Sequence, residues 1–457
     1  MLSIMAISSV LRAASPVTVT LDTTSPGSQI PDDFAGFSVE IARVLPDANG
    51  KHVFSAENVA LVNTYKQLGV KSLRIGGNTA DRATVGIPTE ADIDDLFAFA
   101  RAAGAKVIYT VRLRDYEPAK AAAIAKYVAT KYPDVLSCIS VGNEPNVYAR
   151  EYPKYKEMVG TFYDAIAAAV PNVKFCGPST TPGKAAWVRD YAKDFGPGGR
   201  IAFIGQHSYP GGNAEKVDSA EDGRKKLLST DFVKGYQKFL DSFAPALVEN
   251  RLTFRLEEAN SFHHGGLEGA SNTFAATLWG LDYLHWWASH GAAGVNFHTG
   301  DEVAAGNENR VCRYASYLTS PGGYSVRPMG YAVKTFDVGR HGRVVPVKVE
   351  SSDGVNLTAY GVLGPDGALY VTLINKEHGD GARAANVSLH ADQQYSRGEV
   401  MWLVAPDNDI TKTDGITLGG TTIKDDATWE GVWKDAPDGA GNVELPPASA
   451  AIVKMTR

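Results

Sequence analysis

The feature that most constrains this fold is a series of short apolar runs that alternate with longer amphipathic segments. Each run has the length of a strand, is apolar on both faces and is followed by a helical pattern, which is typical of parallel strands covered by helices. The runs begin near Gly36, Lys71, Lys106, Leu136, Val173, Ile201, Leu252 and Ala293. Repeated strand-helix units of this number predict an α/β fold, a closed (β/α)8 TIM barrel.

The ends of the helices can also be predicted. Thr89 stands three residues before Asp92, which is the pattern of a capping box. The helical segment 93–103 that follows ends at Gly104, a residue type that favours the left-handed conformation past a helix end.

The pattern changes after about residue 338. Strand-length segments then follow one another, separated by turn sequences and without a helix between them. These segments are 344–350, 355–364, 368–376, 385–390, 399–405 and 448–455. We predict a barrel at 31–338 and an all-β sandwich domain at 339–457, with an N-terminal strand in 16–30 that pairs with the sandwich.

Residues 1–15 form a short apolar stretch without the basic start of an export signal. We interpret the stretch as a signal remnant or an added leader and leave it out of the fold. We expect a secreted or periplasmic protein rather than a cytoplasmic one, and the sequence does not indicate the oligomeric state.

Charge and composition exclude several classes of partner. The net charge is −6 and basic residues do not cluster, which argues against a nucleic-acid partner. No apolar run reaches the roughly 20 residues that a membrane helix needs. Cys138, Cys176 and Cys312 are scattered, so they predict neither a disulfide framework nor a metal cluster, and we expect no metal and no cofactor.

Two of the predicted strands end in carboxylates. The strand 136–142 leads into Asn143-Glu144-Pro145, and the strand 252–256 leads into Glu257 and Glu258. The carboxyl ends of barrel strands meet at one mouth, so these side chains are expected to face each other. A lone Glu at a strand end is usually solvated or caps a helix, but a facing pair is what glycoside hydrolysis requires. Alternation sends Glu257 and Glu258 to opposite faces, and parity alone does not decide which of them enters the mouth.

Several motifs occur at the ends of the predicted strands. They are Phe37-Ser38-Val39-Glu40, Leu73-Arg74-Ile75-Gly76-Gly77-Asn78, Val141-Gly142-Asn143-Glu144-Pro145-Asn146, Gln206-His207-Ser208-Tyr209 and Glu258-Ala259-Asn260-Ser261, which leads to Gly265-Gly266. With these motifs the chain resembles the clan A retaining glycoside hydrolases over essentially its whole length. Within the clan it resembles glycoside hydrolase family 79, the β-glucuronidase and heparanase family.

The resemblance implies a role for each of these residues. Glu144 would be the acid and base, and Glu258 the nucleophile, which leaves Glu257 as a structural residue paired with Arg255 or another nearby base. The resemblance also implies substrate contacts. Asn143 would bind the 2-hydroxyl of the sugar, Tyr209 would orient the nucleophile, and Glu40 and Asn78 would bind sugar hydroxyls.

A glucuronide carries a carboxylate at C6, and the family binds it with a glycine-rich turn. His264, Gly265 and Gly266 would form that turn, assisted by Tyr324 or Tyr331. His298 ends the last barrel strand and would line the pocket. Adjacent histidines at 263 and 264 point in different directions, so we do not expect them to bind a metal.

The predicted function is a retaining exo-β-glucuronidase that acts on glucuronic-acid-containing glycans or glycosides. One alternative is another clan A glycosidase, such as a xylosidase or arabinofuranosidase. Another is an endo-acting, heparanase-like enzyme, although that would favour a groove lined by Lys and Arg. A third alternative, from a different class, is a non-catalytic carbohydrate-binding barrel, which would have no need of both carboxylates.

Overall fold

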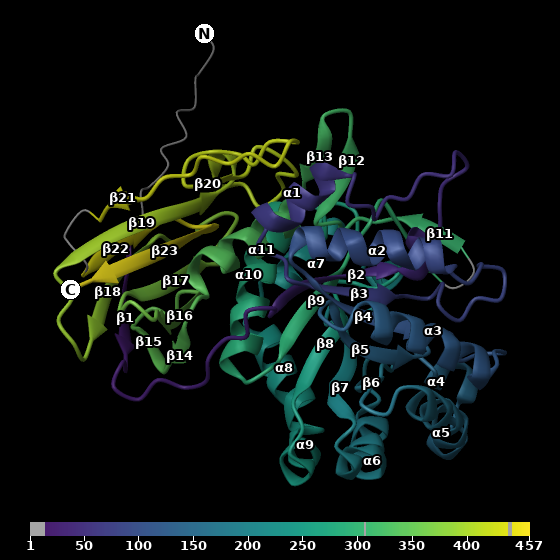
Figure 1. Cartoon of the computed structure of the whole chain (residues 1–457). Coiled ribbons are helices and arrows are strands. Elements are labelled where there is room, and N and C mark those ends of the chain that lie inside the picture. The colour runs from purple at the N-terminus through teal and green to yellow at the C-terminus, as the bar shows by residue number, and fades with distance from the viewer. Residues whose placement is uncertain (1–13, 306–307, 437–440) are drawn as a thin grey trace.

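The chain folds into a barrel and a β-rich C-terminal part, which lie side by side in Figure 1. The structure is a computed structural model that describes residues 14–305, 308–436 and 441–457. The predicted leader lies outside the described residues, apart from residues 14 and 15. Among the helices described, none combines the length and the apolarity needed to span a bilayer.

Parallel strands close into a barrel in chain order, from β2 to β9. Their bounds are β2 (Ala35–Glu40), β3 (Ser72–Gly76), β4 (Lys106–Val111), β5 (Leu136–Val141), β6 (Phe175–Pro178), β7 (Ile201–Ser208), β8 (Phe254–Ala259) and β9 (Gly294–His298). Each strand coincides with one of the predicted apolar runs. The predicted TIM barrel is confirmed.

Helices surround the barrel because each strand buries its outer face against the helix that follows. Their bounds are α1 (Val59–Gln67), α2 (Glu90–Ala103), α3 (Pro118–Lys131), α4 (Asn146–Ala149), α5 (Tyr152–Ala169), α6 (Ala185–Phe195), α7 (Ala220–Leu227), α8 (Asp231–Asp241), α9 (Ala244–Asn250), α10 (Phe274–Ser289) and α11 (Pro328–Gly339). The capping box at the start of α2 is present: Thr89 N donates to Asp92 and Asp92 N donates to the Thr89 hydroxyl. Gly104 ends α2 with a φ of 75°.

Two hairpins that the sequence did not predict lie between β9 and α11. They are formed by β10 (Glu302–Ala305) with β11 (Glu308–Val311), and by β12 (Tyr317–Ser320) with β13 (Gly323–Val326). The first hairpin stands at the carboxyl end of the barrel and contributes Ala304 and Ala305 to the cavity there.

The C-terminal part consists of two sheets that share one hydrophobic core, as a sandwich does. Sheet order is β15-β1-β18-β22 in one and β14-β16-β17-β23-β19-β20 in the other, where β21 also pairs with β19. The bounds are β14 (Arg343–Val345), β15 (Val347–Ser351), β16 (Leu357–Leu363), β17 (Leu369–Asn375), β18 (Ala385–Ala391), β19 (Arg397–Val404), β20 (Thr417–Leu418), β21 (Lys434–Asp435), β22 (Asn442–Leu445) and β23 (Ser449–Thr456). The segment 344–350 is two strands in different sheets, because Pro346 has no N–H to continue a ladder.

The first strand of the described residues belongs to the sandwich and not to the barrel. β1 (Ser15–Leu21) lies between β15, to which it is antiparallel, and β18, to which it is parallel. Val17, Val19 and Leu21 point into the sandwich core, which follows from their alternation with polar residues.

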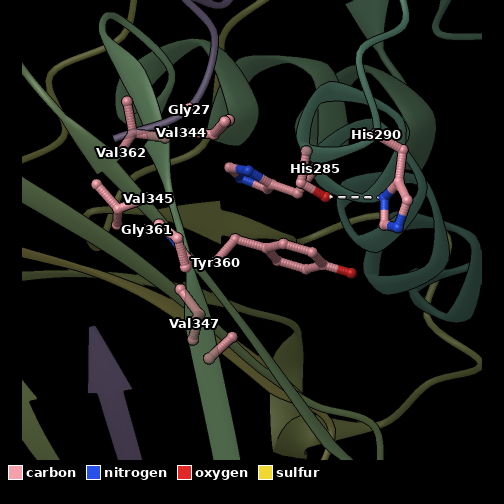
Figure 2. Close-up of a pocket in the computed structure, with 12 residues that line it drawn as sticks. Gly27, His285, His290, Val344, Val345, Val347, Tyr360, Gly361 and Val362 are labelled. Carbon is pink, nitrogen blue, oxygen red and sulfur yellow. Dashed lines mark hydrogen bonds between the residues drawn. The ribbon is translucent and has the colours of Figure 1, made fainter. Parts of the chain in front are cut away.

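The barrel and the sandwich meet where α10 packs on β16. Asp282 of α10 accepts hydrogen bonds from Thr358 and Tyr360 at 2.7 Å each and pairs with Lys376 at 2.9 Å. One turn further along α10, the His285 ring stacks on Tyr360 with its centroid 5.1 Å away. Figure 2 shows these two rings in a hollow of about 350 Å³ between the end of α10 and the strands β14 and β16.

Candidate active site

Glu144 and Glu258 meet at the carboxyl end of the barrel. Glu144 follows β5 and Glu258 lies in β8, and a carboxylate oxygen of each lies within 4.8 Å of the other. Both side chains line a cavity of about 480 Å³. The backbone of Glu144 has a φ of 46°, and the loop is fixed by a hydrogen bond from Glu144 N to Ser179 O. Such backbone strain is typical of residues that are held for function.

Arg74 of β3 lies beside this pair and links Glu258 to residues of the neighbouring strands and loops. The guanidinium is fully buried and donates to Glu258 Oε2 at 2.7 Å, to Asn143 Oδ1 at 2.7 Å and to Ser38 Oγ at 3.2 Å. A Cβ at Gly76 would lie 2.3 Å from Arg74 Cζ, so glycine is required for the guanidinium to lie over the end of β3. Because the guanidinium of Arg74 lies 2.7 Å from the carboxylate of Glu258, its positive charge stabilises the ionised form of that carboxylate.

Glu258 is held as a carboxylate by its neighbours. Burial alone would raise its pKa, but the charges of His207, His298 and Arg74 outweigh burial, and the pKa lies below its usual value. Tyr209 donates its hydroxyl to Glu258 Oε1 at 2.9 Å, as predicted for a residue that orients this carboxylate. Burial raises the pKa of Tyr209 well above its usual value, so the tyrosine keeps the proton that it donates.

Glu144 is more open than Glu258 and has a different partner. Its side chain is 17% exposed, and Oε1 lies 3.0 Å from His207 Nδ1. The other ring nitrogen of His207 faces Arg74 Nη2 at 3.5 Å. The imidazole of His207 therefore bridges Glu144 and Arg74.

Alternation predicts that Glu257 and Glu258 point to opposite faces of β8, but the structure departs from this. The register between β7 and β8 shifts between Gln206 and His207, so both glutamates lie inside the barrel. Glu257 Oε1 is 4.0 Å from His207 Nε2, and Glu258 Oε1 is 3.9 Å from His207 Nδ1. Glu257 is fully buried below the mouth.

The partners of Glu257 agree only in part with the expected ones. Glu257 accepts hydrogen bonds from the Ser179 hydroxyl and from the Cys176 thiol, the latter at 3.4 Å. Arg255 instead pairs with Asp33 at 3.2 Å and donates to Asn296. Glu257 therefore does not pair with Arg255, which lies nearer the amino end of the barrel. The base nearest to Glu257 is His207, which fits the other option of the prediction.

His298 lines the cavity, and Glu40 does not. Glu40 is buried and accepts from Thr79 N, the Thr79 hydroxyl and Ala304 N at 2.9, 2.6 and 3.0 Å. The structure thus corrects the prediction that Glu40 binds sugar hydroxyls, since its oxygens already hold the β10 hairpin. His298 lies 3.4 Å from Glu40 and 4.0 Å from Glu258. Burial lowers the pKa of His298, but the two carboxylates raise it above its usual value overall.

The two asparagines near the mouth are linked to each other. Asn78 lines the cavity and donates to Ala304 O at 2.9 Å. Asn143 donates to Asn78 at 3.4 Å and is 5% exposed. Asn143 does not reach the cavity wall among the described residues, because Arg74 holds its amide oxygen.

Only part of the predicted glycine turn, residues 264–266, lines the cavity. His263, His264 and Gly265 line the wall, whereas Gly266 lies behind it, where a Cβ would come 2.9 Å from the Tyr314 ring. Gly265 has a φ of 87°, which favours glycine. Within the described part of the chain, the Gly265 N–H has no hydrogen-bond partner.

Neither predicted tyrosine reaches the site. The Tyr324 hydroxyl accepts from Asn58 at 2.7 Å, and the Tyr331 hydroxyl accepts from Ile423 N at 2.9 Å. Among the described residues the cavity tyrosines are Tyr209 and Tyr314. Tyr314 takes the place of the predicted tyrosines because it follows the β10–β11 hairpin, which no pattern in the sequence indicates.

Sequence reasoning also missed the roles of Arg74 and His207. The signal was present, since a charged or ionisable side chain inside an otherwise apolar barrel strand requires a buried partner. Tyr314 had no comparable signal.

The same groups have the spacing that a metal ion requires. Glu144, His207 and Glu258 each offer a ligand atom within 4.8 Å of the others. Arg74 Nη1 already lies 2.7 Å from Glu258, however, and would repel a divalent cation placed there. We therefore interpret the cluster as an acid-base site.

Comparison with known proteins identifies the fold. No protein-family model and no curated protein sequence matches the chain. A GH51 arabinofuranosidase from Xanthomonas axonopodis pv. citri has a similar structure, with a TM-score of 0.73 at 14% identity over 97% of this chain and 100% of its own. A 4-O-α-L-rhamnosyl-β-D-glucuronidase from Fusarium oxysporum 12S, solved with Rha-GlcA, gives 0.72 at 18% identity over 96% and 98%.

A monomeric β-xylosidase from Caulobacter crescentus CB15 is also similar, with a TM-score of 0.64 at 12% identity over 96% of this chain and 99% of its own. By their descriptions, these solved structures are an arabinofuranosidase, a glucuronidase and a xylosidase. The likeness shows that the chain has their fold, a barrel followed by a β domain. Membership of family 79 stays a prediction.

Proposed function

We propose that the protein is a retaining glycoside hydrolase in which Glu258 is the nucleophile and Glu144 the acid and base. The observation that carries the proposal is the short gap between the two carboxylates, of which one oxygen each lies within 4.8 Å of the other. Retaining glycosidases hold their carboxyl groups about 5 to 5.5 Å apart, and inverting ones leave about 6.5 to 9.5 Å for a water. The gap between Glu144 and Glu258 fits direct attack on the anomeric carbon.

The two carboxylates have environments that suit these roles. Glu258 is buried beside Arg74 with a lowered pKa, so it is ionised and available to form the glycosyl-enzyme. Glu144 faces the cavity and is held by His207, where it can protonate the departing oxygen and then activate water.

We further propose that the substrate is a terminal β-linked glucuronide. Gly265 lines the cavity and its N–H has no partner among the described residues, and unpaired N–H groups of this kind bind carboxylates without a cation. One of the similar solved structures is a glucuronidase. The proposed substrates are therefore glucuronic-acid-containing glycans or glycosides.

A pentoside is the second candidate. Among the described residues that line the cavity there is no Lys or Arg, and a xyloside or arabinofuranoside has no carboxylate to neutralise. Two of the similar structures named above act on such sugars by their descriptions.

A panel of p-nitrophenyl glycosides separates these candidates. The β-glucuronide should exceed the β-glucoside, β-xyloside and α-L-arabinofuranoside in kcat/KM by at least about 100-fold, because a site built for a polar group rejects analogues that lack it. A preference for either pentoside would overturn the glucuronide proposal. Mass spectrometry after incubation with a 2-fluoro glycoside should find the sugar on Glu258. With no adduct and no turnover, the chain would be a carbohydrate-binding barrel instead.

A further inference from the structure

A second hollow adjoins the cavity and is apolar. It has a volume of about 340 Å³ and lies between the loops after β6 and β7 and the first turns of α8. We call it the α8 pocket. Its apolar lining consists of Pro182, Tyr209, Pro210, Phe232, Tyr236 and Phe239. Pro182 and Tyr209 also line the cavity that contains Glu144, so the two hollows share a wall.

The α8 pocket lies on the Glu144 side of the mouth. Asn146, two residues after Glu144, exchanges hydrogen bonds of 2.8 and 3.0 Å with Thr181, which places Pro182 beside the Glu144 loop. Val147 lines the cavity on this side and is 62% exposed, so it presents an apolar surface at the rim. A retaining glycosidase protonates the leaving group on the side of its acid. The leaving group would therefore pass along Val147 and Pro182 toward the α8 pocket.

The charge of this region selects among leaving groups. The described lining of the α8 pocket includes neither Lys nor Arg, and its charged residue is Asp231 at the start of α8. A sulfated or carboxylated leaving group would meet no opposite charge there. An aromatic group of one or two rings would instead contact the rings of Phe232 and Phe239.

We propose that the α8 pocket binds the apolar or aromatic aglycone of the glycoside substrate. The proposal rests on the proposed glycosidase function and specifies the substrate beyond its sugar. We assign the aglycone as the occupant because the α8 pocket shares Pro182 and Tyr209 with the cavity, on the side of Glu144 where the leaving group would depart.

Gly235 allows the test to be specific. It lies in α8 at the pocket, and a Cβ built there meets nothing within 4 Å. Gly235→Trp should fill the α8 pocket without touching Glu144 or Glu258. Gly235→Ala is the matched control, since it adds one methyl group to the same open space. Gly235→Leu is a second filling variant, used if the Trp variant does not fold by circular dichroism.

The first measurement is the affinity for free 2-naphthol by isothermal titration calorimetry, which does not depend on the sugar. The wild type and Gly235→Ala should bind 2-naphthol, and Gly235→Trp should bind it at least about tenfold more weakly. If the wild type does not bind 2-naphthol, or the Trp variant binds it equally well, the proposal is wrong.

The second measurement compares 2-naphthyl and methyl glycosides of the sugar that the panel selects. Gly235→Trp should raise KM for the naphthyl substrate about tenfold and leave the methyl substrate unchanged. Turnover with unchanged KM values would reject the aglycone site and keep the hydrolase. Loss of 2-naphthol binding in the Trp variant, in a protein that hydrolyses no glycoside, would reject the hydrolase and keep the α8 pocket as an aromatic-binding site.

Discussion

The barrel mouth and the junction between barrel and sandwich both bury charges, but they satisfy them differently. At the junction Asp282 has one cation, Lys376, and two hydroxyl donors, and both charged residues are less than 5% exposed. At the mouth, Glu258 pairs with Arg74, whose Nε has no hydrogen-bond partner among the described residues. Glu144, and Glu257 below the mouth, lie 3.0 and 4.0 Å from the same histidine, His207.

The difference separates a structural ion pair from a reactive site. A buried pair with complete hydrogen bonding holds two elements in register, and nothing in it is available to a substrate. A cluster with more carboxylates than cations leaves one carboxylate open to a cavity and lowers the pKa of another. The following variants test whether the two regions have these separate roles.

Glu258→Gln should have the largest effect. Removing the proposed nucleophile should lower kcat by at least about 10⁴-fold, because no other group can form the covalent intermediate. The measurement is steady-state hydrolysis of the best p-nitrophenyl glycoside, with circular dichroism to verify folding. Residual kcat within 100-fold of wild type would show that Glu258 is not the nucleophile.

Glu144→Ala serves as the comparison for that loss. It should reduce hydrolysis of a poor leaving group such as methanol by about 10² to 10⁴-fold and spare good leaving groups, which need no proton. Equal losses on all leaving groups would contradict the acid role.

Lys376→Met should affect stability and leave catalysis intact. Asp282 would be left buried without its cation, which costs about 3 to 5 kcal/mol in the free energy of unfolding. Urea denaturation followed by tryptophan fluorescence measures the change. The double variant Asp282→Asn with Lys376→Met is the control and should lose less, because no buried charge remains. A kcat of the folded single variant below half the wild-type value would show that the junction influences the mouth.

Tyr209→Phe should have an intermediate effect at the mouth. The hydroxyl donates to Glu258 and helps to lower its pKa, and a hydrogen bond to a charged group contributes about 1.5 to 3 kcal/mol. Its loss should reduce kcat by about 10 to 100-fold. Because the pKa of Glu258 rises when the donor is removed, the acid limb of kcat/KM should move to higher pH. An unmoved acid limb would assign Tyr209 to packing alone.

His285→Phe should have the smallest effect, on the pH dependence of stability. Burial lowers the pKa of His285 to about 3, so the folded protein keeps it neutral while the unfolded chain takes up a proton below about pH 6.5. Its contribution to stability is therefore lost as the pH falls from about 6.5 toward 3. The variant keeps a ring on Tyr360 and should remove up to about 1.4 kcal/mol per pH unit of this slope. If the unfolding free energies of the wild type and of His285→Phe changed in parallel between pH 6.5 and 4.5, His285 would not be buried in its neutral form.

The regular parts of the fold were predictable from local pattern. Apolar runs and helix-capping residues such as Thr89 and Gly104 mark the barrel because they depend on neighbours in the sequence. The β10 hairpin was not predictable, since its short strand, the segment 302–305, is held by a distant carboxylate, Glu40.

The active site likewise contains features that the sequence predicts and features that depend on tertiary structure. The place of Glu144 follows from its position at a strand end, whereas the role of Tyr209 was expected from the family resemblance. The direction of Glu257 depends on a register shift between β7 and β8, which is a tertiary property. The choice between Tyr314 and the expected Tyr324 or Tyr331 likewise depends on which loop folds over the mouth.

The position of β1 between β15 and β18 has a consequence for biosynthesis. β1 is synthesised before the barrel, and the strands that flank it follow only after the whole barrel has been made. Until then Val17, Val19 and Leu21 have no sandwich core to enter. Removing the first two dozen residues would therefore strip an internal strand from a domain encoded more than 300 residues downstream, and a C-terminal fragment expressed alone would need this strand supplied as a separate peptide.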